Sequence, residues 1–442
     1  MIQPASTSSR PPENRIRHAG DIADWRLCLG CGACAFACTD QKIRLVDFVE
    51  EGIRPIVTPS DCGSCTACLD VCPAWDNDHT EINARPGAMR DLVPYCGPVL
   101  EIWEGHAVDP ETRRLGASGG VITALSRFAL EHEGVHGVLH IGSDPDDPTR
   151  NRTKMSRSTT ELLERTGSRY AAASACDRLD LIAAAPAPCL FVGQPSEVTA
   201  LRKAQRLRRD LDRNVALAIS FFCAGSPSRQ GTLRLLESLG VEPNAVRDLR
   251  YRGNGWPGHF AVKVSDDDVP PRRLTYAESW GFLQSYRPFS TQLSPDGTGE
   301  DADLSCGDPW YRPVIPGEAG SSLIVVRTEA GRAFLQRAIA AGWVELTPAE
   351  PWKLLQSQKN LLSKRGSVGG RIAALRLLGL PAPRLRGFDL FANWRQLTVR
   401  RALSSVLGTM RRAVARRYHR PLGLRPPPQA TPAAAAVSAS RP

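Results

Sequence analysis

The stretch CLGCGACAFAC at residues 28–38 is repeated as CGSCTACLDVC at residues 62–72, and Pro73 follows the second copy. Each copy has the spacing C-x2-C-x2-C-x3-C. Thiolates are soft ligands that suit iron–sulfur centres, and three of them on one tight loop can converge on a single centre. The small residues between the cysteines let backbone N–H groups approach and donate to the sulfurs. The two runs therefore predict two metal–sulfur centres.

This spacing resembles that of bacterial-type ferredoxins, which hold two cubane clusters. In that pattern three thiolates of each run bind one cluster, and the fourth crosses to the other cluster. We therefore predict two [4Fe-4S] clusters with the following ligands: Cys28, Cys31, Cys34 and Cys72 for the first, and Cys62, Cys65, Cys68 and Cys38 for the second.

The alternative is a pair of zinc sites, which also use C-x2-C pairs but seldom supply eight cysteines in two identical runs. Disulfides are not expected, because residues 1–27 are polar and contain no apolar signal-peptide core. We expect the reducing cytosol as the compartment. No apolar run reaches the roughly 18 residues of a membrane span.

The basic charge of the chain is confined to one region. The formal net charge is +10 over 442 residues, but the part from residue 384 onward contributes +11 and the remainder −1. The globular body therefore has no nucleic-acid signature, and no specific nucleic-acid partner is predicted.

The length indicates several domains. Between the two cysteine runs, two short alternating stretches predict a hairpin. The predicted organisation is a disordered leader (1–20), a ferredoxin-type module (21–80), a linker that contains Cys96, two parts of one α/β region (98–245 and 246–375), and a basic helical and disordered tail (384–442).

A strand–turn–helix rhythm predicts the α/β region. Apolar strands are expected at 103–108, 189–192, 215–222 and 321–327, and each is followed by a polar or glycine-bearing turn and a helix. We expect a mostly parallel sheet with helices packed on it. Cofactors on such sheets bind at the carboxyl ends of the strands, where these turns gather.

Two loops are candidates for cofactor binding. Ser118-Gly119-Gly120 opens an amphipathic helix, with Ser118 as the expected N-cap and Gly134 as the stop, and free N–H groups at a helix N-terminus favour a phosphate. Residues 252–258 form an unusual glycine-rich path around Trp256, which could serve as a platform for a planar ring, with Arg252 available for a phosphate or carboxylate. Residues 303–310, which include Trp310, resemble a second wall of the same kind. The alternative is that both loops are ordinary turns.

The tail is predicted to contain a basic amphipathic helix within residues 394–420, in which arginines alternate with apolar residues. Such a helix could lie on an anionic membrane surface, bind an acidic protein, or remain solvated.

The motif series Ser-Gly-Gly (118–120), FCAGSP (222–227), RGNGWPG (252–258) and ADLSCGDP (302–309) behind a ferredoxin module resembles the coenzyme F-420 hydrogenase/dehydrogenase beta-subunit family, which also contains hydroxymethyl chlorophyll reductases. The resemblance covers about residues 25–375. It implies iron–sulfur clusters, an FAD and electron transfer to a deazaflavin or another acceptor. It also implies the following residues near the flavin: Ser118, Gly119, Gly120, Gly255, Trp256, Pro257 and Asp308.

Three positions depart from that family. Relatives often carry cysteine in G-T-P-C-Q and R-C-x-x-C-x-D, where this chain has Ser196, Thr291 and Ser294. Hydroxyls are poor ligands for a cluster, although Cys223 and Cys306 remain. We therefore expect no further cluster in the flavin domain, so that the N-terminal pair feeds the flavin directly or through a partner.

The resulting prediction is an iron–sulfur flavoprotein oxidoreductase that passes electrons between two [4Fe-4S] clusters, FAD and an organic acceptor. An electron donor or acceptor protein, such as a ferredoxin or redox subunit, is the expected partner. No catalytic residue is identified. The alternative is a non-enzymatic electron-transfer or docking subunit of a larger redox complex, and FAD binding separates the two hypotheses.

Overall fold

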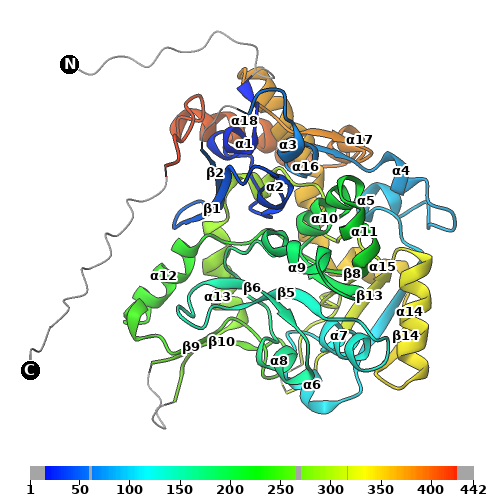
Figure 1. Cartoon of the computed structure of the whole chain (residues 1–442). Helices are drawn as coiled ribbons and strands as arrows, with labels where there is room; N and C mark the ends of the chain where they lie inside the picture. Colours follow the sequence, from blue (N-terminus) through cyan, green and yellow to red (C-terminus); the bar gives the residue numbers. More distant parts are fainter. Residues whose placement is uncertain (1–14, 59–61, 265–269, 316, 426–442) are drawn as a thin grey trace, which may run out of the picture.

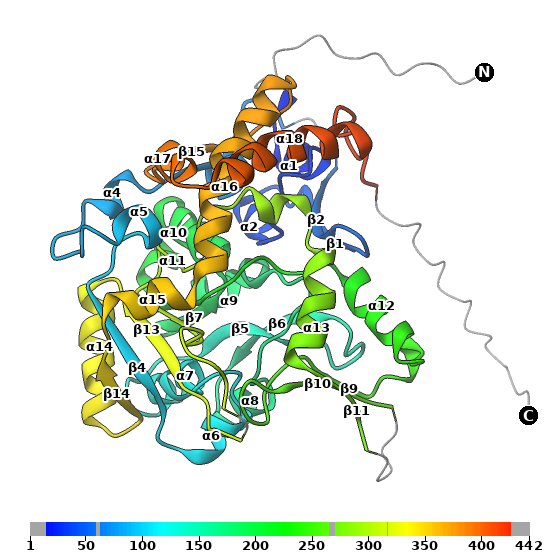
Figure 2. The same cartoon turned by 180° about the vertical axis from the view of Figure 1, so that it is seen from behind.

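The computed structural model describes residues 15–58, 62–264, 270–315 and 317–425 (Figure 1). The N-terminal module lies above an eight-stranded sheet, and the C-terminal helices close around the module (Figures 1 and 2). Residues 1–14 of the predicted leader and 426–442 of the predicted tail lie outside the described residues. Helix α1 (Ala19–Asp24) begins before the predicted end of the leader at residue 20, and it buries Ala19, Ile22 and Ala23.

The N-terminal module is small and built around its cysteine loops. Its central hairpin is antiparallel and pairs Ile43 with Val57 and Phe48 with Gly52, as predicted. Its remaining elements are short because the cysteine loops occupy most of the chain. The elements after α1 are α2 (Ala33–Ala37), β1 (Ile43–Phe48), β2 (Gly52–Val57), α3 (Ala67–Asp70) and β3 (Asp76–Asp78). The predicted linker contains two short helices, α4 (Thr80–Asn83) and α5 (Val93–Cys96).

The large sheet has the strand order β14-β4-β13-β12-β8-β7-β5-β6. The central strands β12, β8, β7 and β5 are parallel, and the outer strands pair antiparallel at both ends. The predicted α/β architecture is therefore confirmed, and its parallel strands form the centre of the sheet. The strands are β4 (Glu101–Ala107), β5 (Val138–Ser143), β6 (Asn151–Ser156), β7 (Cys189–Gly193), β8 (Val215–Phe221), β12 (Leu304–Gly307), β13 (Ser322–Val326) and β14 (Val344–Pro348).

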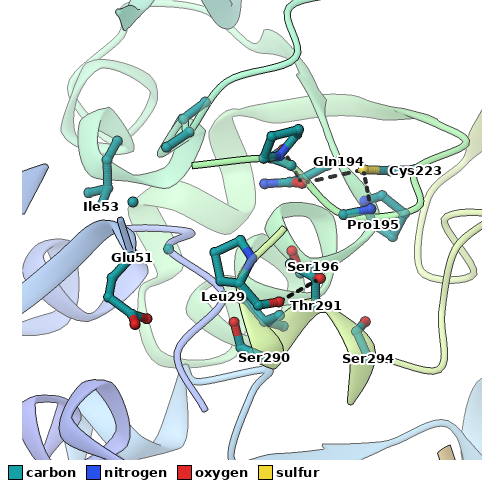
Figure 3. A pocket seen from close by; sticks show the side chains of 18 of the residues that line it. Leu29, Glu51, Ile53, Gln194, Pro195, Ser196, Cys223, Ser290, Thr291 and Ser294 are labelled. Carbon is teal, nitrogen blue, oxygen red and sulfur yellow. Dashed lines mark hydrogen bonds between the residues drawn. The ribbon is translucent and has the colours of Figure 1, made fainter. Parts of the chain in front are cut away.

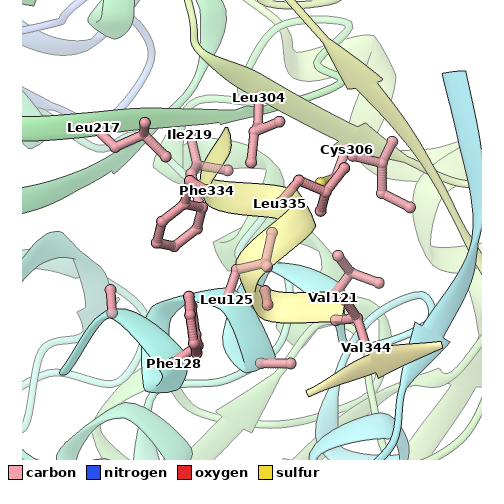
Figure 4. Close-up of a cluster of buried hydrophobic side chains, with 14 of the residues drawn as sticks. Val121, Leu125, Phe128, Leu217, Ile219, Leu304, Cys306, Phe334, Leu335 and Val344 are labelled. Atoms are coloured by element: carbon pink, nitrogen blue, oxygen red, sulfur yellow. The ribbon is translucent and has the colours of Figure 1, made fainter. Parts of the chain in front are cut away.

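Both faces of this sheet are buried, because successive side chains of a strand point to opposite faces. Leu190 of β7 and Ile219 of β8 belong to the core beneath α7 and α14 (Figure 4). Phe191 and Ala218 face the other core, which contains residues of α10 together with Cys31 and its neighbours. The helices that follow or cover these strands are α6 (Pro110–Leu115), α7 (Val121–Glu131), α8 (Thr159–Glu164), α9 (Asp180–Ala183), α10 (Pro195–Leu207), α11 (Arg209–Asn214) and α14 (Glu329–Ala340).

A smaller antiparallel sheet stands beside the large one. Its strand order is β11-β10-β9, and helices α12 and α13 pack against it around Leu236, Tyr251 and Phe260. The elements are α12 (Arg229–Ser238), β9 (Asp248–Arg250), β10 (His259–Lys263), β11 (Arg272–Thr275) and α13 (Tyr276–Leu283). This sheet positions the loop at residues 252–258.

The C-terminal part is a set of helices that joins the α/β region to the N-terminal module. Its elements are α15 (Pro351–Ser357), α16 (Lys359–Leu377), β15 (Arg384–Arg386), α17 (Leu390–Arg395) and α18 (Val399–Ala415). Strand β15 pairs with β3, and Ala413 and Tyr418 share a core with Ile22 and Trp75. The described part of the tail is therefore packed on the body, and none of its helices is long and apolar enough to cross a membrane; the same holds for the other described residues.

Candidate functional site

The first four predicted ligands surround one cavity. Cys28, Cys31, Cys34 and Cys72 all line it, together with apolar side chains that include Ile22 and Leu45. The cavity holds about 380 Å³ of empty space, its mouth included. Three of these thiols come from the loop before α2 and from α2 itself, and the fourth comes from the second cysteine run. The structure thus brings together the crossed set of thiols that the spacing predicts.

The loop around this cavity depends on glycine. Gly30 and Gly32 have φ angles of 81° and 88°, a region that residues with a Cβ rarely adopt. A Cβ on Gly32 would lie 2.9 Å from the Asp177 backbone nitrogen. The Gly30 N–H donates to the Cys28 sulfur over 3.3 Å, and the Ala33 N–H bonds the Cys31 thiol. Such bonds tune the potential of a sulfur-ligated centre.

Three thiols of this set, Cys31, Cys34 and Cys72, have raised pKa values. Burial and the nearby Cys72 and Cys28 thiols raise the pKa of Cys31 well above its usual range. Burial, followed by Cys31 and Cys28, does the same for Cys34. Burial and Cys28 raise the pKa of Cys72 to about 12. A buried set of thiols in an apolar cavity fits a positively charged metal–sulfur centre, because the metal would compensate the negative charge of the thiolates.

The second set of predicted ligands lies closer to the surface. Cys65 is exposed, Cys38 and Cys62 are half-buried and Cys68 is buried. Burial raises the pKa of Cys68, and the nearby Cys62, Cys65 and Cys38 thiols add to the effect, so the four thiols lie near one another. The Lys42 N–H donates to the Cys38 sulfur over 3.4 Å.

Within the described ranges, no three His, Cys, Asp or Glu side chains are arranged to hold a single metal ion. All thirteen cysteines are free thiols.

The α/β region is hydrogen-bonded to the cysteine loop that lines the first cavity. The Cys176 N–H donates to the Cys31 carbonyl over 3.0 Å, and the Ser174 hydroxyl donates to the Gly30 carbonyl over 2.5 Å. Lys203 of α10 lies near the Cys72 thiol and lowers its pKa against the effect of burial. The N-terminal module is therefore an integral part of the fold.

A second cavity lies between the module and the α/β region (Figure 3). It holds about 550 Å³ of empty space, its mouth included. Leu29 and Gly30, from the first cysteine loop, line both cavities. Gln194 stands in its wall and accepts hydrogen bonds from the Cys223 thiol and the Ser226 hydroxyl. We call this cavity the interface pocket.

The three cysteine-to-hydroxyl departures meet in the interface pocket. Ser196, Thr291 and Ser294 all line it, together with Cys223. The Thr291 hydroxyl donates to the Pro288 carbonyl over 2.8 Å, and the Ser294 hydroxyl donates to the Asp296 carbonyl over 3.3 Å. Cys306, by contrast, is buried in the core beneath α7 and α14. Only one thiol therefore lines the described part of this pocket.

The predicted flavin residues converge at another place. The Arg252 guanidinium forms a bidentate ion pair with Asp308 at 2.7 and 2.5 Å, and the Trp256 indole N–H donates to the same carboxylate over 2.8 Å. Burial disfavours the charged guanidinium, but Asp308 raises the pKa of Arg252 above its ordinary value. The rings of Trp256 and Trp310 are stacked with centroids 5.3 Å apart, and the rings of Tyr276 and Trp310 are stacked with centroids 5.5 Å apart.

The Ser118-Gly119-Gly120 turn adjoins this aromatic cluster through Gly320. A Cβ on Gly320 would lie 2.1 Å from the Ser118 carbonyl oxygen and 3.1 Å from the Trp256 Cβ. The predicted helix is present, but Ser118 does not cap it. Gly120 is the N-cap, because the Ser118 hydroxyl donates to the Ser321 carbonyl instead. The helix ends at Glu131, with His132 rather than Gly134 following it.

These residues do not leave a free guanidinium for a phosphate. Arg252 was expected to be available for an anion, but Asp308 and the Pro257 carbonyl occupy its guanidinium. Only glycine fits at positions 119 and 120, because backbone atoms of other segments lie within 2.7 Å of where a Cβ would be. Gly255 has no atom within 4 Å of such a Cβ, so its loop is open to a ligand.

Several residues of the interface pocket were not predicted. Lys364 lies in the middle of the 19-residue helix α16, and Arg54 lies on β2. Neither belongs to a motif, whereas Ser196, Cys223, Thr291 and Ser294 had been singled out in the sequence. Their shared location depends on contacts between the module, α10 and α16, which no local pattern reveals.

Comparison with known proteins agrees with this architecture. Residues 27–75 match the family model of a 4Fe-4S dicluster domain, so the N-terminal module is an iron–sulfur domain. Residues 102–179 match the N-terminal model and residues 188–351 the C-terminal model of the coenzyme F420 hydrogenase/dehydrogenase beta subunit.

Similar proteins occur in methanogens. The chain is 27% identical over 286 residues to the coenzyme F420 hydrogenase subunit beta of Methanococcus voltae, covering 63% of this chain and 95% of that protein. It is 24% identical over 259 residues to the F420-dependent formate dehydrogenase subunit beta of Methanocaldococcus jannaschii, covering 58% of this chain and 64% of that protein.

A solved structure shares the fold. A chain of the F420-reducing [NiFe] hydrogenase complex from Methanosarcina barkeri superposes with a TM-score of 0.51 at 21% identity, covering 66% of this chain and 98% of that chain. Since two successive family models account for nearly all of residues 102–351, the chain belongs to the coenzyme F420 hydrogenase/dehydrogenase beta-subunit family of oxidoreductases.

Proposed function

We propose that this chain is an electron-transfer oxidoreductase in which each of the two thiol sets holds one [4Fe-4S] cluster. The observation that carries the proposal is the apolar cavity lined by Cys28, Cys31, Cys34 and Cys72, with backbone N–H groups directed at its sulfurs. The second set, with the exposed Cys65, would be the entry or exit point for electrons. We place this chemistry in the reducing cytosol.

We further propose FAD as the redox partner of the clusters, and a deazaflavin of the coenzyme F420 type or another organic molecule as the acceptor. Clusters transfer single electrons, whereas a flavin also carries two-electron chemistry. The Trp256 ring and the open loop at Gly255 would orient a planar ring, and the Ser118-Gly119-Gly120 turn before α7 would lie beside it. The names of the relatives support the choice of acceptor.

One observation favours the alternative, a non-enzymatic electron-transfer subunit. Arg252 and Asp308 satisfy each other in a buried ion pair, and Trp256 is already stacked on Trp310. In that case the region around residues 252–310 would be a rigid docking module, and the clusters alone would carry electrons.

Anaerobic purification with iron, sulfide and flavin quantified on one sample separates the two. Two cubanes with bound FAD support the oxidoreductase. The next step is then a screen of electron acceptors, in which the redox state of the protein is followed by visible absorption and EPR. Two cubanes without FAD support the electron-transfer subunit. A preparation without iron after cluster reconstitution would overturn both.

The partner is proposed to be an acidic redox protein that docks on α18. This helix faces α16 with Ser405, Thr409 and Ala413, and it exposes Val399, Leu403, Leu407 and Val414 among arginines. Its C-terminal end packs against the iron–sulfur module, where the Leu422 N–H donates to the Asp24 carbonyl over 3.0 Å. An acidic surface bound here would therefore lie beside the clusters.

A further inference from the structure

The interface pocket contains polar groups that the protein does not satisfy. Among the residues that the structure describes, the Ser290 hydroxyl and the Arg54 Nε are buried and have no hydrogen-bond partner. Both side chains line the pocket, and their residues are only 2% and 3% exposed. Because a buried polar group without a partner is unfavourable, these groups indicate a ligand that completes their hydrogen bonding.

The third polar group is the Lys364 amine. It donates to the Ala224 carbonyl over a long 3.4 Å, and its residue is 9% exposed. An ammonium group has three N–H donors, so this single long bond leaves capacity for a ligand.

The acceptors in the same wall are already used. The two carboxylate oxygens of Asp296 accept backbone N–H groups of Thr298, Gly299 and Glu300 at 2.8–2.9 Å. The Gln194 carbonyl oxygen accepts from Cys223 and Ser226. Glu51, at the hairpin turn, also lines the pocket, and its carboxylate lies 3.9 Å from the Arg54 guanidinium. Apart from Glu51, the pocket offers donors rather than free acceptors.

The charges around Lys364 agree with this polarity. Burial, Arg287 and Arg371 lower the pKa of Lys364 to about 8, against the opposing effect of Cys223 and Asp296. The amine is therefore mostly protonated at neutral pH, in surroundings that contain two further cations. An anion would relieve their mutual repulsion.

From these donors we propose that the interface pocket binds a small anion, an inorganic oxyanion or a small carboxylate, through Lys364, Ser290 and Arg54. Such a ligand would lie against Leu29 and Gly30, the loop between two ligands of the first cluster. Pro195, Pro227 and Pro288 give the rest of the wall a rigid apolar surface suited to a compact molecule. The binding does not rest on the presence of FAD or clusters.

Calorimetric titration of the anaerobically purified full chain tests the proposal, with inorganic phosphate in one arm and oxalate in the other. We expect saturable binding of at least one probe. The probe that binds more tightly shows whether the ligand is an inorganic oxyanion or a carboxylate. Lys364→Met should weaken binding about tenfold or more, because it removes a charge-assisted hydrogen bond. Lys359→Met, an exposed lysine on the same helix, is the matched control and should bind as the wild type does.

Ser290→Ala provides a second test that does not depend on the stability of the Lys364 variant. Because the Ser290 hydroxyl has no partner in the protein, its removal should leave the melting temperature unchanged and still weaken binding several-fold. Absence of saturable binding in both arms, or binding that neither variant weakens, would overturn the proposal.

A redox readout separates this proposal from the proposed function. If clusters are present, a bound anion next to the first cysteine loop should shift the midpoint potential of the first cluster to a more negative value, since cluster potentials follow the surrounding charge. The Lys364→Met variant should not show this shift at the same anion concentration. Clusters without anion binding contradict only the pocket, and anion binding without clusters contradicts only the electron-transfer function.

Discussion

His79 shows how a single residue can make stability depend on pH. Its Nδ1 lies 2.9 Å from a Glu300 carboxylate oxygen, and its Nε2 lies 3.1 Å from one of Asp301. Burial opposes the charged ring, but Asp301 and Glu300 together raise the pKa of His79 to about 10. The folded state therefore binds a proton that the unfolded chain releases above a pKa of about 6.5.

The expected result is a loss of stability in alkali. The contribution of His79 is fully present below about pH 6.5 and is lost as the pH rises through about 10. The free energy of unfolding, measured by denaturant titration at several pH values, should fall over this window.

His79→Gln should reduce that pH dependence and cost about 3–5 kcal/mol near neutral pH, because it removes the cation that bridges two buried carboxylates and leaves Glu300 with Arg365 alone. His419→Gln, an exposed histidine, should behave as the wild type does. An unchanged pH profile in His79→Gln would show that another group dominates.

The crossed assignment of cluster ligands gives a prediction at the level of single thiols. Cys72→Ser should remove the EPR signal of the first cluster and leave the second, whereas Cys38→Ser should do the reverse. The pairing follows from the neighbours of each thiol, since Cys72 lies beside Cys28 and Cys38 beside Cys68. Cys96→Ala, a buried thiol outside both sets, is the control and should keep both signals. Loss of the same signal in both variants would contradict the crossing.

At the scale of the elements, the contact between α16 and α18 depends on Gly370. A Cβ at this position would lie 2.6 Å from the Trp394 indole nitrogen and would collide with the Ser405 hydroxyl. We expect Gly370→Val to destabilise the docking of α18 by about 1–3 kcal/mol, because overpacking forces the helices apart.

Limited trypsin digestion should detect this change as faster cleavage among the arginines of α18. Gly408→Ala is the matched control, because the nearest atom to its Cβ is the Ser404 hydroxyl at 3.7 Å. That variant should be as resistant as the wild type or more so, since alanine is favoured over glycine within helices by about 0.5–1 kcal/mol. Equal digestion of the two variants would argue against a tight α16–α18 contact.

The local elements were predictable where their patterns are local. The hairpin at residues 43–57 and the strands at β7, β8 and β13 follow apolar runs, and they appear within about one residue of the expected positions. The predicted N-cap of α7 was wrong, because the Ser118 hydroxyl donates to the carbonyl of Ser321, about two hundred residues later in the chain. The single helix expected within residues 394–420 is α18 preceded by the short α17.

At the scale of the whole molecule, the charge is concentrated on the surface next to the iron–sulfur module. If an acidic redox protein docks on α18, its association should be fast at low salt and slow down as salt screens the arginines. Stopped-flow oxidation of a reduced acidic ferredoxin by the reconstituted protein measures this rate.

Arg400→Glu combined with Arg411→Glu should reduce the association rate about tenfold at low salt. The same charge change on exposed Arg209 and Arg213 of α11 should have little effect. An equal loss in both pairs would mean that net charge, rather than the α18 surface, controls the encounter.

The amino-acid sequence alone determined the iron–sulfur module, the α/β character of the body and the basic tail. These depend on cysteine spacing, on alternating or continuous apolar runs and on composition, all of which are local properties. It also grouped Arg252, Trp256 and Asp308, since the motifs that contain them are recognisable in order.

Only the tertiary structure decided how these parts meet. It showed that Arg252 is occupied by Asp308, and that Ser196, Thr291 and Ser294 share one pocket with Cys223 and Lys364. It also showed that Cys31 belongs to the same core as Phe191 of the sheet. Such contacts join residues up to several hundred positions apart, and their partners are chosen by packing and by the need to satisfy buried polar groups, which no short stretch of sequence records.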